Sequence, residues 1–235
     1  MGSAPPLAAD EIHLWLMDLT LAPERLAALA ATLSADEQVR AARFRFAEHR
    51  DRFSAGRGLL RELLGGYVQR PAATLRFAQG AQGKPHLVGE AAGALHFNLS
   101  HSGERALYAV ARREVGVDIE AWARRVDYAA VLERVCTPHE WAVFQSLPAI
   151  RQTEAFFACW TRKEAIAKAL GGGLASGLRT LHVCCVADDA CAGRMDVRDA
   201  AGRDWTVLNV PLESGWSAAL AAQGADWRWR CWRWA

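Results

Sequence analysis

Two carboxylates separated by a single residue occur in the segment 116–120, Gly-Val-Asp-Ile-Glu. Alternate side chains of a strand share one face, so a strand here presents Asp118 and Glu120 side by side. Two carboxylates this close repel each other unless a cation or a proton lies between them. Their hard oxygens suit Mg²⁺, which keeps several waters and takes further ligands from substrate phosphates. The pair predicts a metal site, although two acids at a strand end are also common without one.

A second candidate group lies on the longest predicted helix, residues 153–170. Trp160, Glu164 and Lys168 are four residues apart and therefore lie along one stripe of that helix. In the functional interpretation, Glu164 is a third carboxylate for the metal and Lys168 neutralises charge on a phosphate. The alternative is an ordinary ion pair on the helix surface, worth about 0.2–0.5 kcal/mol. Trp160 favours the functional interpretation, because a tryptophan on the same stripe indicates a partly buried face.

A polar segment after the predicted strand 95–99 offers further groups to an anion. Ser100, His101 and Ser102 supply hydroxyls, an imidazole and backbone N–H groups. A plain hairpin turn is the alternative. The sequence has no GxSxG elbow and no evident third partner for the Ser-His pair, so the pair is not a hydrolase signature.

Lysine use is unusual, because only three of the 28 basic residues are lysines. An ammonium is a compact point charge and a guanidinium is a planar fork, so the retained lysines suggest phosphate contact or proton management, with chance as the alternative. Arginine is concentrated in residues 40–61, which include Arg52 and form either a solvated helix face or a phosphate-binding surface. The three lysines are Lys84, within Gly83-Lys84-Pro85, Lys163 and Lys168.

Composition limits the classes of protein that remain. The chain has 235 residues, a net charge of +2, 51% hydrophobic and 23% charged residues, which predicts a folded protein. No apolar run reaches the roughly 18 residues of a membrane span, and we expect no secretory signal at the start. Six cysteines without a CxxC pair predict reduced thiols in a cytoplasmic protein. The lack of a basic excess argues against nucleic acid as a partner.

Helices and strands recur along the chain and must position these residues. A capping box, Ser34 with Glu37, predicts a helix toward Arg50, and Pro71 ends a further helix over 59–68. The glycine triplet 171–173 ends the helix 153–170. The pattern predicts an α+β protein with a seam near 113–116 and two similar subdomains. Other helices are predicted at 26–33, 126–135 and 138–144, and strands at 12–17, 95–99, 106–111, 115–119, 181–186, 205–210, 216–222 and 227–234.

Four of these segments together resemble, in order and spacing, the motifs of the Sfp-type 4′-phosphopantetheinyl transferases: Gly83-Lys84-Pro85 and residues 97–102, 116–120 and 160–168. The resemblance runs from about residue 34 to 174. It implies an α+β fold of two similar subdomains related by a pseudo-two-fold, residues 1–114 and 115–235, with coenzyme A at their junction. The implied reaction moves the 4′-phosphopantetheine arm of coenzyme A onto a serine of an apo acyl or peptidyl carrier protein. It requires Mg²⁺ and releases adenosine 3′,5′-bisphosphate.

The resemblance also implies a role for each matching residue. Asp118, Glu120 and Glu164 would bind the metal together with the coenzyme A diphosphate. Glu164, directly or through a metal-bound water, would accept the serine proton, and Lys168 would stabilise the phosphoryl oxygens. Contacts with coenzyme A are implied for Arg52, Gly83, Lys84, Ser100, His101, Asp118, Lys163 and Lys168.

Several positions depart from the family pattern, and two of the departures bear on the site. Glu37 occupies a position that is often basic in relatives, whereas Arg40 falls where relatives use a basic residue near the adenine. Ile119, between the two acids, cannot ligate a metal or relay a proton, which favours Glu164 or water as the base. No metal ligand is missing, so we expect an active enzyme.

Two other classes of function stay open. A Mg²⁺-dependent phosphodiesterase or nuclease would use the same three acids without a carrier protein, and a catalytically inactive relative would only bind. The partners expected for a transferase are coenzyme A and an acidic apo carrier protein from fatty-acid, polyketide or nonribosomal-peptide synthesis. We expect no nucleic acid and no membrane partner, and a monomer.

Overall fold

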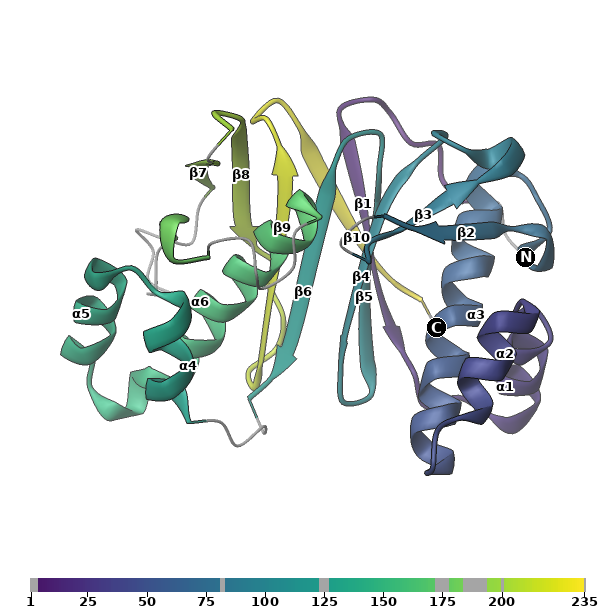
Figure 1. Cartoon of the computed structure of the whole chain (residues 1–235), viewed down its shortest axis with the longest axis horizontal. Helices are drawn as coiled ribbons and strands as arrows, with labels where there is room; N and C mark the ends of the chain where they lie inside the picture. The colour runs from purple at the N-terminus through teal and green to yellow at the C-terminus, as the bar shows by residue number, and fades with distance from the viewer. Residues whose placement is uncertain are drawn as a thin grey trace.

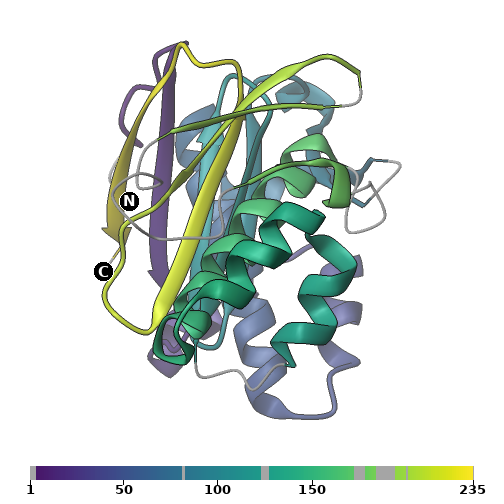
Figure 2. The same cartoon turned by 90° about the vertical axis from the view of Figure 1, so that its left-hand side faces the viewer.

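The computed structural model of the chain describes residues 4–80, 83–122, 127–171, 178–183, 194–199 and 201–234. Two four-stranded sheets occupy its centre, and helices cover the outer side of each sheet (Figure 1). The side view shows the helices of the second half lying across the strands of their own sheet (Figure 2). No helix among the described residues is long and apolar enough to cross a membrane.

Each half of the chain contains one sheet and one helix of 22 residues, α3 or α6. The prediction of an α+β fold with two similar halves is therefore confirmed. The first half contains β1 (Glu11–Asp18), α1 (Pro23–Ala30), α2 (Ala35–Ala42), α3 (Ala47–Val68), β2 (Arg76–Gln79), β3 (Pro85–Val88), β4 (His96–Ser102) and β5 (Arg105–Ala111). The second half contains β6 (Val115–Ala121), α4 (Tyr128–Val135), α5 (Pro138–Ser146), α6 (Ala149–Leu170), β7 (Met195–Arg198), β8 (Asp204–Asn209) and β9 (Trp216–Gln223).

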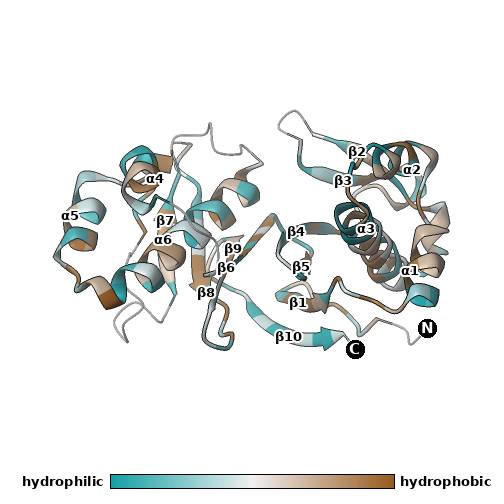
Figure 3. Ribbon diagram, turned by 90° about the horizontal axis from the view of Figure 1, so that it is seen from below, coloured by the Kyte–Doolittle hydropathy of each residue, from teal (hydrophilic) through white to brown (hydrophobic). Residues whose placement is uncertain are grey.

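The last strand, β10 (Arg228–Trp234), returns to the first sheet, where it pairs in parallel with β1. The strand order is β10-β1-β5-β4 in the first sheet and β6-β9-β8-β7 in the second, with β2 and β3 as a separate hairpin. Trp232 stacks on Trp15 with ring centroids 4.9 Å apart. The Trp/Arg alternation at this end is thus a terminal strand with an aromatic face, and β10 is predominantly hydrophilic and pale in Figure 3.

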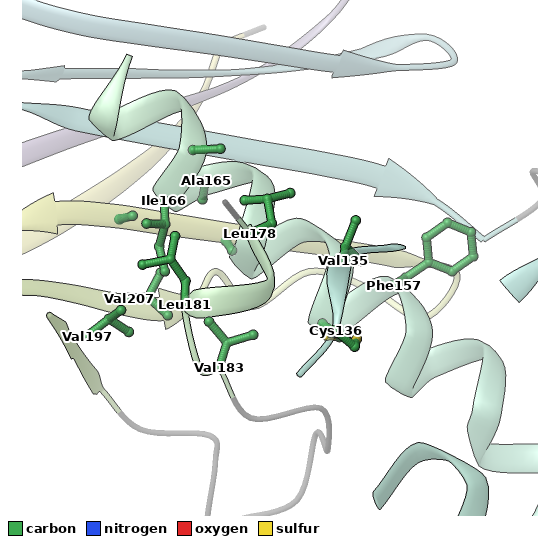
Figure 4. Close-up of a cluster of buried hydrophobic side chains, with 14 of the residues drawn as sticks. Val135, Cys136, Phe157, Ala165, Ile166, Leu178, Leu181, Val183, Val197 and Val207 are labelled. Atoms are coloured by element: carbon green, nitrogen blue, oxygen red, sulfur yellow. Dashed lines mark hydrogen bonds between the residues drawn. The ribbon is translucent and has the colours of Figure 1, made fainter. Parts of the chain in front are cut away.

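Apolar side chains form three layers, and the middle layer joins the two halves. The inner faces of the two sheets pack against each other through residues such as Leu14, Leu107, Val117 and Leu220. On the outer faces, α3 packs on the first sheet and α6 on the second. Figure 4 shows side chains of α4, α6, β7 and β8 meeting in the outer core of the second half.

Several predicted boundaries differ from the structure. The capping box of Ser34 and Glu37 is present, but α2 ends at Ala42 and α3 begins at Ala47, so the predicted helix toward Arg50 is two helices. Of the predicted strand 181–186, the described residues 181–183 are not a strand, and the rest lies outside the described residues. Gly171 ends α6 with a φ of +74°, as predicted for the glycine triplet.

Candidate active site

Gly116 allows β6 and α6 to approach closely. A Cβ built on this residue would lie 2.1 Å from the carbonyl oxygen of Ala165 and 2.4 Å from the nitrogen of Ala169. No side chain fits there, so the backbone of β6 lies directly against that of α6. Asp118 follows two residues later on the same face of the strand. The close approach therefore brings Asp118 against the face of α6 that carries Lys168.

Asp118 is the buried centre of the site, with a relative exposure of 3%. Its Oδ1 accepts hydrogen bonds from Ser100 Oγ and Lys168 Nζ, both at 2.7 Å, and Lys168 Nζ also donates to Ser100 Oγ at 2.8 Å. Burial raises the pKa of Asp118, and the Lys168 ammonium opposes that rise. Three elements, β4, β6 and α6, thus meet in one closed ring of hydrogen bonds.

Glu164 lies one turn before Lys168 on α6. Burial and then the negative charge of Asp118 raise the pKa of Glu164 to about 7, with Lys168 opposing and Glu120 adding to the rise. The third acid, Glu120, accepts a hydrogen bond at Oε2 from Ser102 Oγ at 2.8 Å. Asp118 and Glu120 therefore lie close enough to Glu164 for their charges to act on its carboxyl group.

Mg²⁺ is the metal that the family resemblance implies. Two buried carboxylate oxygens without a hydrogen-bond partner show whether the residues fit it. Asp118 Oδ2 and Glu164 Oε1 are buried oxygens without a hydrogen-bond donor. Buried carboxylate oxygens in this state are costly unless a cation or proton reaches them. Within the described part of the chain, no three His, Cys, Asp or Glu side chains form a metal cage by themselves. The residues fit Mg²⁺ as an ion that keeps waters and shares a substrate's phosphate oxygens.

Alternate residues of β4 join the two halves across the seam. Asn98 Oδ1 accepts from the backbone N–H of Val117 at 2.9 Å, and Ser102 Oγ accepts from that of Ala121 at 3.1 Å. With Ser100, these side chains fix the strand that carries the acids; β4 and β6 run side by side in Figure 1. The sequence analysis assigned no role to Asn98. The period-two spacing of polar residues in 98–102 is the signal that predicts such a role.

His101 and Arg52 lie beside the ring on its exposed side. Partial desolvation, then the positive charges of Lys168 and Arg52, hold the pKa of His101 below its usual value. Arg52, on α3, pairs with Glu48 at 2.6 Å and with Glu104 at 3.4 Å. The structure thus brings His101 close enough to Lys168 and Arg52 for both positive charges to act on its imidazole.

A cavity of about 690 Å³ opens beside α2, α3 and the β2–β3 hairpin. We call it the arginine cavity. Gly83 lines it with a φ of +82°, and a Cβ there would meet open space. The resemblance implies a place near the adenine for Arg40, whereas Arg76 and the aromatic residues had no predicted role. The arginine cavity is lined by Arg40, Arg57, Arg61, Arg76, Phe53 and Phe77 together with the acids Asp36 and Glu37.

Lys84 lies at the seam of the two halves. Its ammonium donates to Glu114 Oε2 at 2.6 Å and to the carbonyl oxygens of Val115 and Ala169, both at 3.1 Å. These bonds use all three of its hydrogens. The structure therefore places Lys84 as a link between the hairpin and the last turn of α6.

Lys163 is not brought to the acids. Its side chain is fully buried, pairs with Glu140 at 2.9 Å, and donates to the carbonyl oxygens of Leu178 and Leu181 at 2.9 and 2.7 Å. Glu140 in turn accepts from the N–H of Val183. On the 3.6-residue helix, Lys163 faces away from the stripe of Glu164 and Lys168, which explains why neighbours in sequence are separated in space.

Comparison with known proteins gives the same family from both halves. A model of the 4′-phosphopantetheinyl transferase superfamily matches residues 114–222, and a model of the 4′-phosphopantetheinyl transferase N-terminal region matches residues 21–113. The chain is 38% identical over 229 residues to the 4′-phosphopantetheinyl transferase HetI of Nostoc sp., covering 96% of this chain and 93% of HetI.

Two further relatives are similar over most of their length. A putative 4′-phosphopantetheinyl transferase of Synechocystis sp. is 31% identical, covering 83% of this chain and 76% of its own. The 4′-phosphopantetheinyl transferase psf-1 of Bacillus pumilus is 34% identical, covering 71% and 70%. With the two-half fold and these motifs in place, the chain belongs to the 4′-phosphopantetheinyl transferase superfamily, among its two-domain Sfp-type members, and is a 4′-phosphopantetheinyl transferase.

Proposed function

We propose that the group around Asp118 is where this transferase moves the 4′-phosphopantetheine arm of coenzyme A onto a serine of an apo acyl or peptidyl carrier protein. One observation carries the proposal. Asp118 Oδ2 and Glu164 Oε1 are buried oxygens without a hydrogen-bond partner, and the Lys168 ammonium acts on the pKa of both acids. The oxygens favour a cation and the ammonium favours a phosphate. A diphosphate with Mg²⁺ satisfies both.

In this proposal Asp118, Glu120 and Glu164 hold the metal. Asp118 is fixed by Ser100 and Lys168 at one oxygen, which leaves the other for the ion. Glu120 is oriented by the hydroxyl of Ser102. When bound, Mg²⁺ neutralises the diphosphate and stabilises the charge that develops on the leaving phosphate.

Glu164 is the proposed proton acceptor. The carrier serine loses its hydroxyl proton to the Glu164 carboxylate while its oxygen forms a bond to the phosphorus that bears the pantetheine arm. The bond from that phosphorus to the oxygen of the other phosphate breaks. Adenosine 3′,5′-bisphosphate leaves with the electron pair. Lys168 uses two of its three ammonium hydrogens on Ser100 and Asp118, and the third is available to the phosphoryl oxygens.

Contacts with coenzyme A are proposed along a line from the acids to the arginine cavity. His101 and Arg52 flank Lys168 and would face the phosphates, while Ser100 orients Asp118 and Lys168. The open space above Gly83 suits the nucleotide end, because no Cβ restricts the approach of the ligand.

Lys84 and Lys163 are proposed to act differently from the motif-based expectation. Both ammonium groups have a carboxylate and two carbonyl partners. A coenzyme A contact would have to replace these bonds. We therefore propose that Lys84 positions the seam between the halves and that Lys163 stabilises the second half, with the phosphates left to Lys168 and the arginines.

The substitution Glu164→Gln tests the proposed base and ligand. It keeps the size of the side chain but removes a proton acceptor, so carrier modification should fall by at least about a hundredfold. Coenzyme A binding, measured by calorimetry, should persist. Glu154→Gln, on the same helix but paired with exposed Arg151, is the matched control and should keep wild-type turnover. Wild-type turnover in Glu164→Gln would disprove the assignment.

The wider setting is also a proposal. We propose that the protein acts as a monomer. A serine acceptor is common to fatty-acid, polyketide and nonribosomal-peptide carriers, and we propose coenzyme A and such a carrier as the two substrates. We propose the cytoplasm as its location, with neither nucleic acid nor a membrane as a partner.

A further inference from the structure

A buried carboxylate belongs to the arginine cavity. Glu37, on α2, has a side chain only 6% exposed. Its Oε1 accepts from Arg57 Nε at 2.8 Å and its Oε2 from Arg61 Nε at 2.6 Å. Burial opposes ionisation, but the bonds from Arg61 and Arg57 outweigh it and lower the pKa of Glu37. An ionised acid therefore lies in the wall of a pocket that otherwise suits an anion.

Glu37 and two backbone carbonyl groups occupy several donors of two arginines of the cavity. Arg61, only 1% exposed, gives Nε to Glu37 and Nη1 to the carbonyl oxygens of Ala72 and Leu75. Arg57 is 18% exposed and directs both Nε and Nη2 at Glu37. Both guanidinium groups lie over the ring of Phe77, at 4.9 and 5.2 Å from its centroid. Arg61 is thus a structural residue, and Arg57 presents only part of its fork to the cavity.

The other two arginines of the cavity are differently placed. The guanidinium of Arg40 lies over the ring of Phe53 at 5.2 Å, and Arg76 is exposed at the start of β2. No carboxylate of the described residues forms an ion pair with either one. The capacity of the cavity for phosphate charge therefore lies with Arg40, Arg76 and the free part of Arg57.

We propose that Glu37 is a specificity-determining residue that weakens the hold of this cavity on a terminal phosphate of the nucleotide. It does so by occupying Arg57 and Arg61 and by adding a negative charge to the wall. The phosphate concerned is the 3′-phosphate, which coenzyme A and adenosine 3′,5′-bisphosphate share. Weaker binding of this group lets the nucleotide product leave more readily. The inference rests on the proposed function, which places the nucleotide end in the arginine cavity.

Binding of two nucleotides isolates the contribution of the 3′-phosphate. Calorimetry gives the affinities of adenosine 3′,5′-bisphosphate and adenosine 5′-phosphate, and their ratio reports on the 3′-phosphate alone. In Glu37→Gln the ratio should rise about fivefold or more, because one negative charge is lost and Arg57 is released. An unchanged or lower ratio in the folded variant would overturn the proposal.

Glu62→Gln is the matched control. Glu62 is also a buried acid, on α3, paired with Arg25 by a hydrogen bond of 2.8 Å, but it lies outside the cavity. Its substitution should lower the melting temperature without changing the ratio of affinities. A general effect of losing a buried ion pair would instead change both variants alike, and would contradict the specific role of Glu37.

A double variant covers the case in which Glu37→Gln does not fold. Glu37→Gln with Arg61→Gln removes both members of the most buried pair, so no uncompensated charge remains inside, yet Arg57 is still released. Its ratio should also rise. If the wild-type protein modifies a carrier but neither variant changes the ratio of affinities, only the role of Glu37 is wrong. If the wild-type protein neither binds the nucleotides nor modifies a carrier, the proposed function is wrong as well.

Discussion

Gly116 and Ala165 are in backbone contact: the position of a Cβ on Gly116 lies 2.1 Å from the carbonyl oxygen of Ala165. This contact sets the spacing between β6, which carries two acids, and α6, which carries the third acid and Lys168. The Asp118–Lys168 bond of 2.7 Å depends on it. One glycine therefore determines how the acids of β6 lie relative to Glu164 and Lys168 on α6.

Gly116→Ala should disrupt both the fold and the site. The new methyl group meets backbone on two sides, which a side-chain rotation cannot relieve, so we expect a loss of about 3 kcal/mol of stability and of nearly all turnover. Thermal unfolding and carrier modification measure the two effects. Gly56→Ala is the control, because its Cβ would make ordinary contacts of 3.6 Å and beyond and should leave stability unchanged or up to about 1 kcal/mol higher. Equal effects of the two substitutions would refute this explanation.

Lys163→Met should act on stability and not on the ligand. Removing one partner of the buried Lys163–Glu140 pair leaves a buried carboxylate, which costs about 3–5 kcal/mol. Where the variant folds, its KM for coenzyme A should match that of the wild type. Arg151→Ala, which breaks an exposed pair with Glu154, should cost less than about 1 kcal/mol. A stable Lys163→Met variant with a raised KM would restore the motif-based assignment.

The Lys84–Glu114 link predicts an acid-dependent loss of stability. Hydrogen bonds from His96 and then Lys84 lower the pKa of Glu114 to about 2, below its unfolded value near 4.5. The stabilisation is therefore complete above the unfolded pKa and is lost as the pH falls from about 4.5 toward 2. Denaturant unfolding at several pH values measures it. Glu114→Gln should be less stable at neutral pH and should lose less on acidification; parallel pH curves for both proteins would contradict this.

The sequence was sufficient to predict the types of residues at the site but not all of their positions. The spacing of Asp118 and Glu120 predicted two acids on one face of a strand, and the spacing of Glu164 and Lys168 predicted one stripe of a helix. Periodicity does not say which face of α6 meets β6, and the contact of Lys163 with coenzyme A was implied by the resemblance alone. The fold shows Lys163 buried on another face, against Glu140.

Contacts between residues far apart in the sequence explain the other differences between the predicted elements and the structure. The return of β10 to β1 joins residues more than two hundred positions apart, and no local pattern encodes that register. The break between α2 and α3 follows from packing: residues 42–50 are all exposed, although their composition suits a helix. Local signals with a direct physical cause were read correctly, such as the capping box at Ser34 and the helix end at Gly171.

Intact-protein mass spectrometry of an apo carrier protein, incubated with this protein, coenzyme A and Mg²⁺, measures the proposed transfer itself. We expect a carrier mass gain equal to one phosphopantetheine arm, which is lost with EDTA and with Asp118→Asn. No gain on any of several carriers, with the protein folded and coenzyme A intact, would contradict it, and so would an undiminished gain in the presence of EDTA.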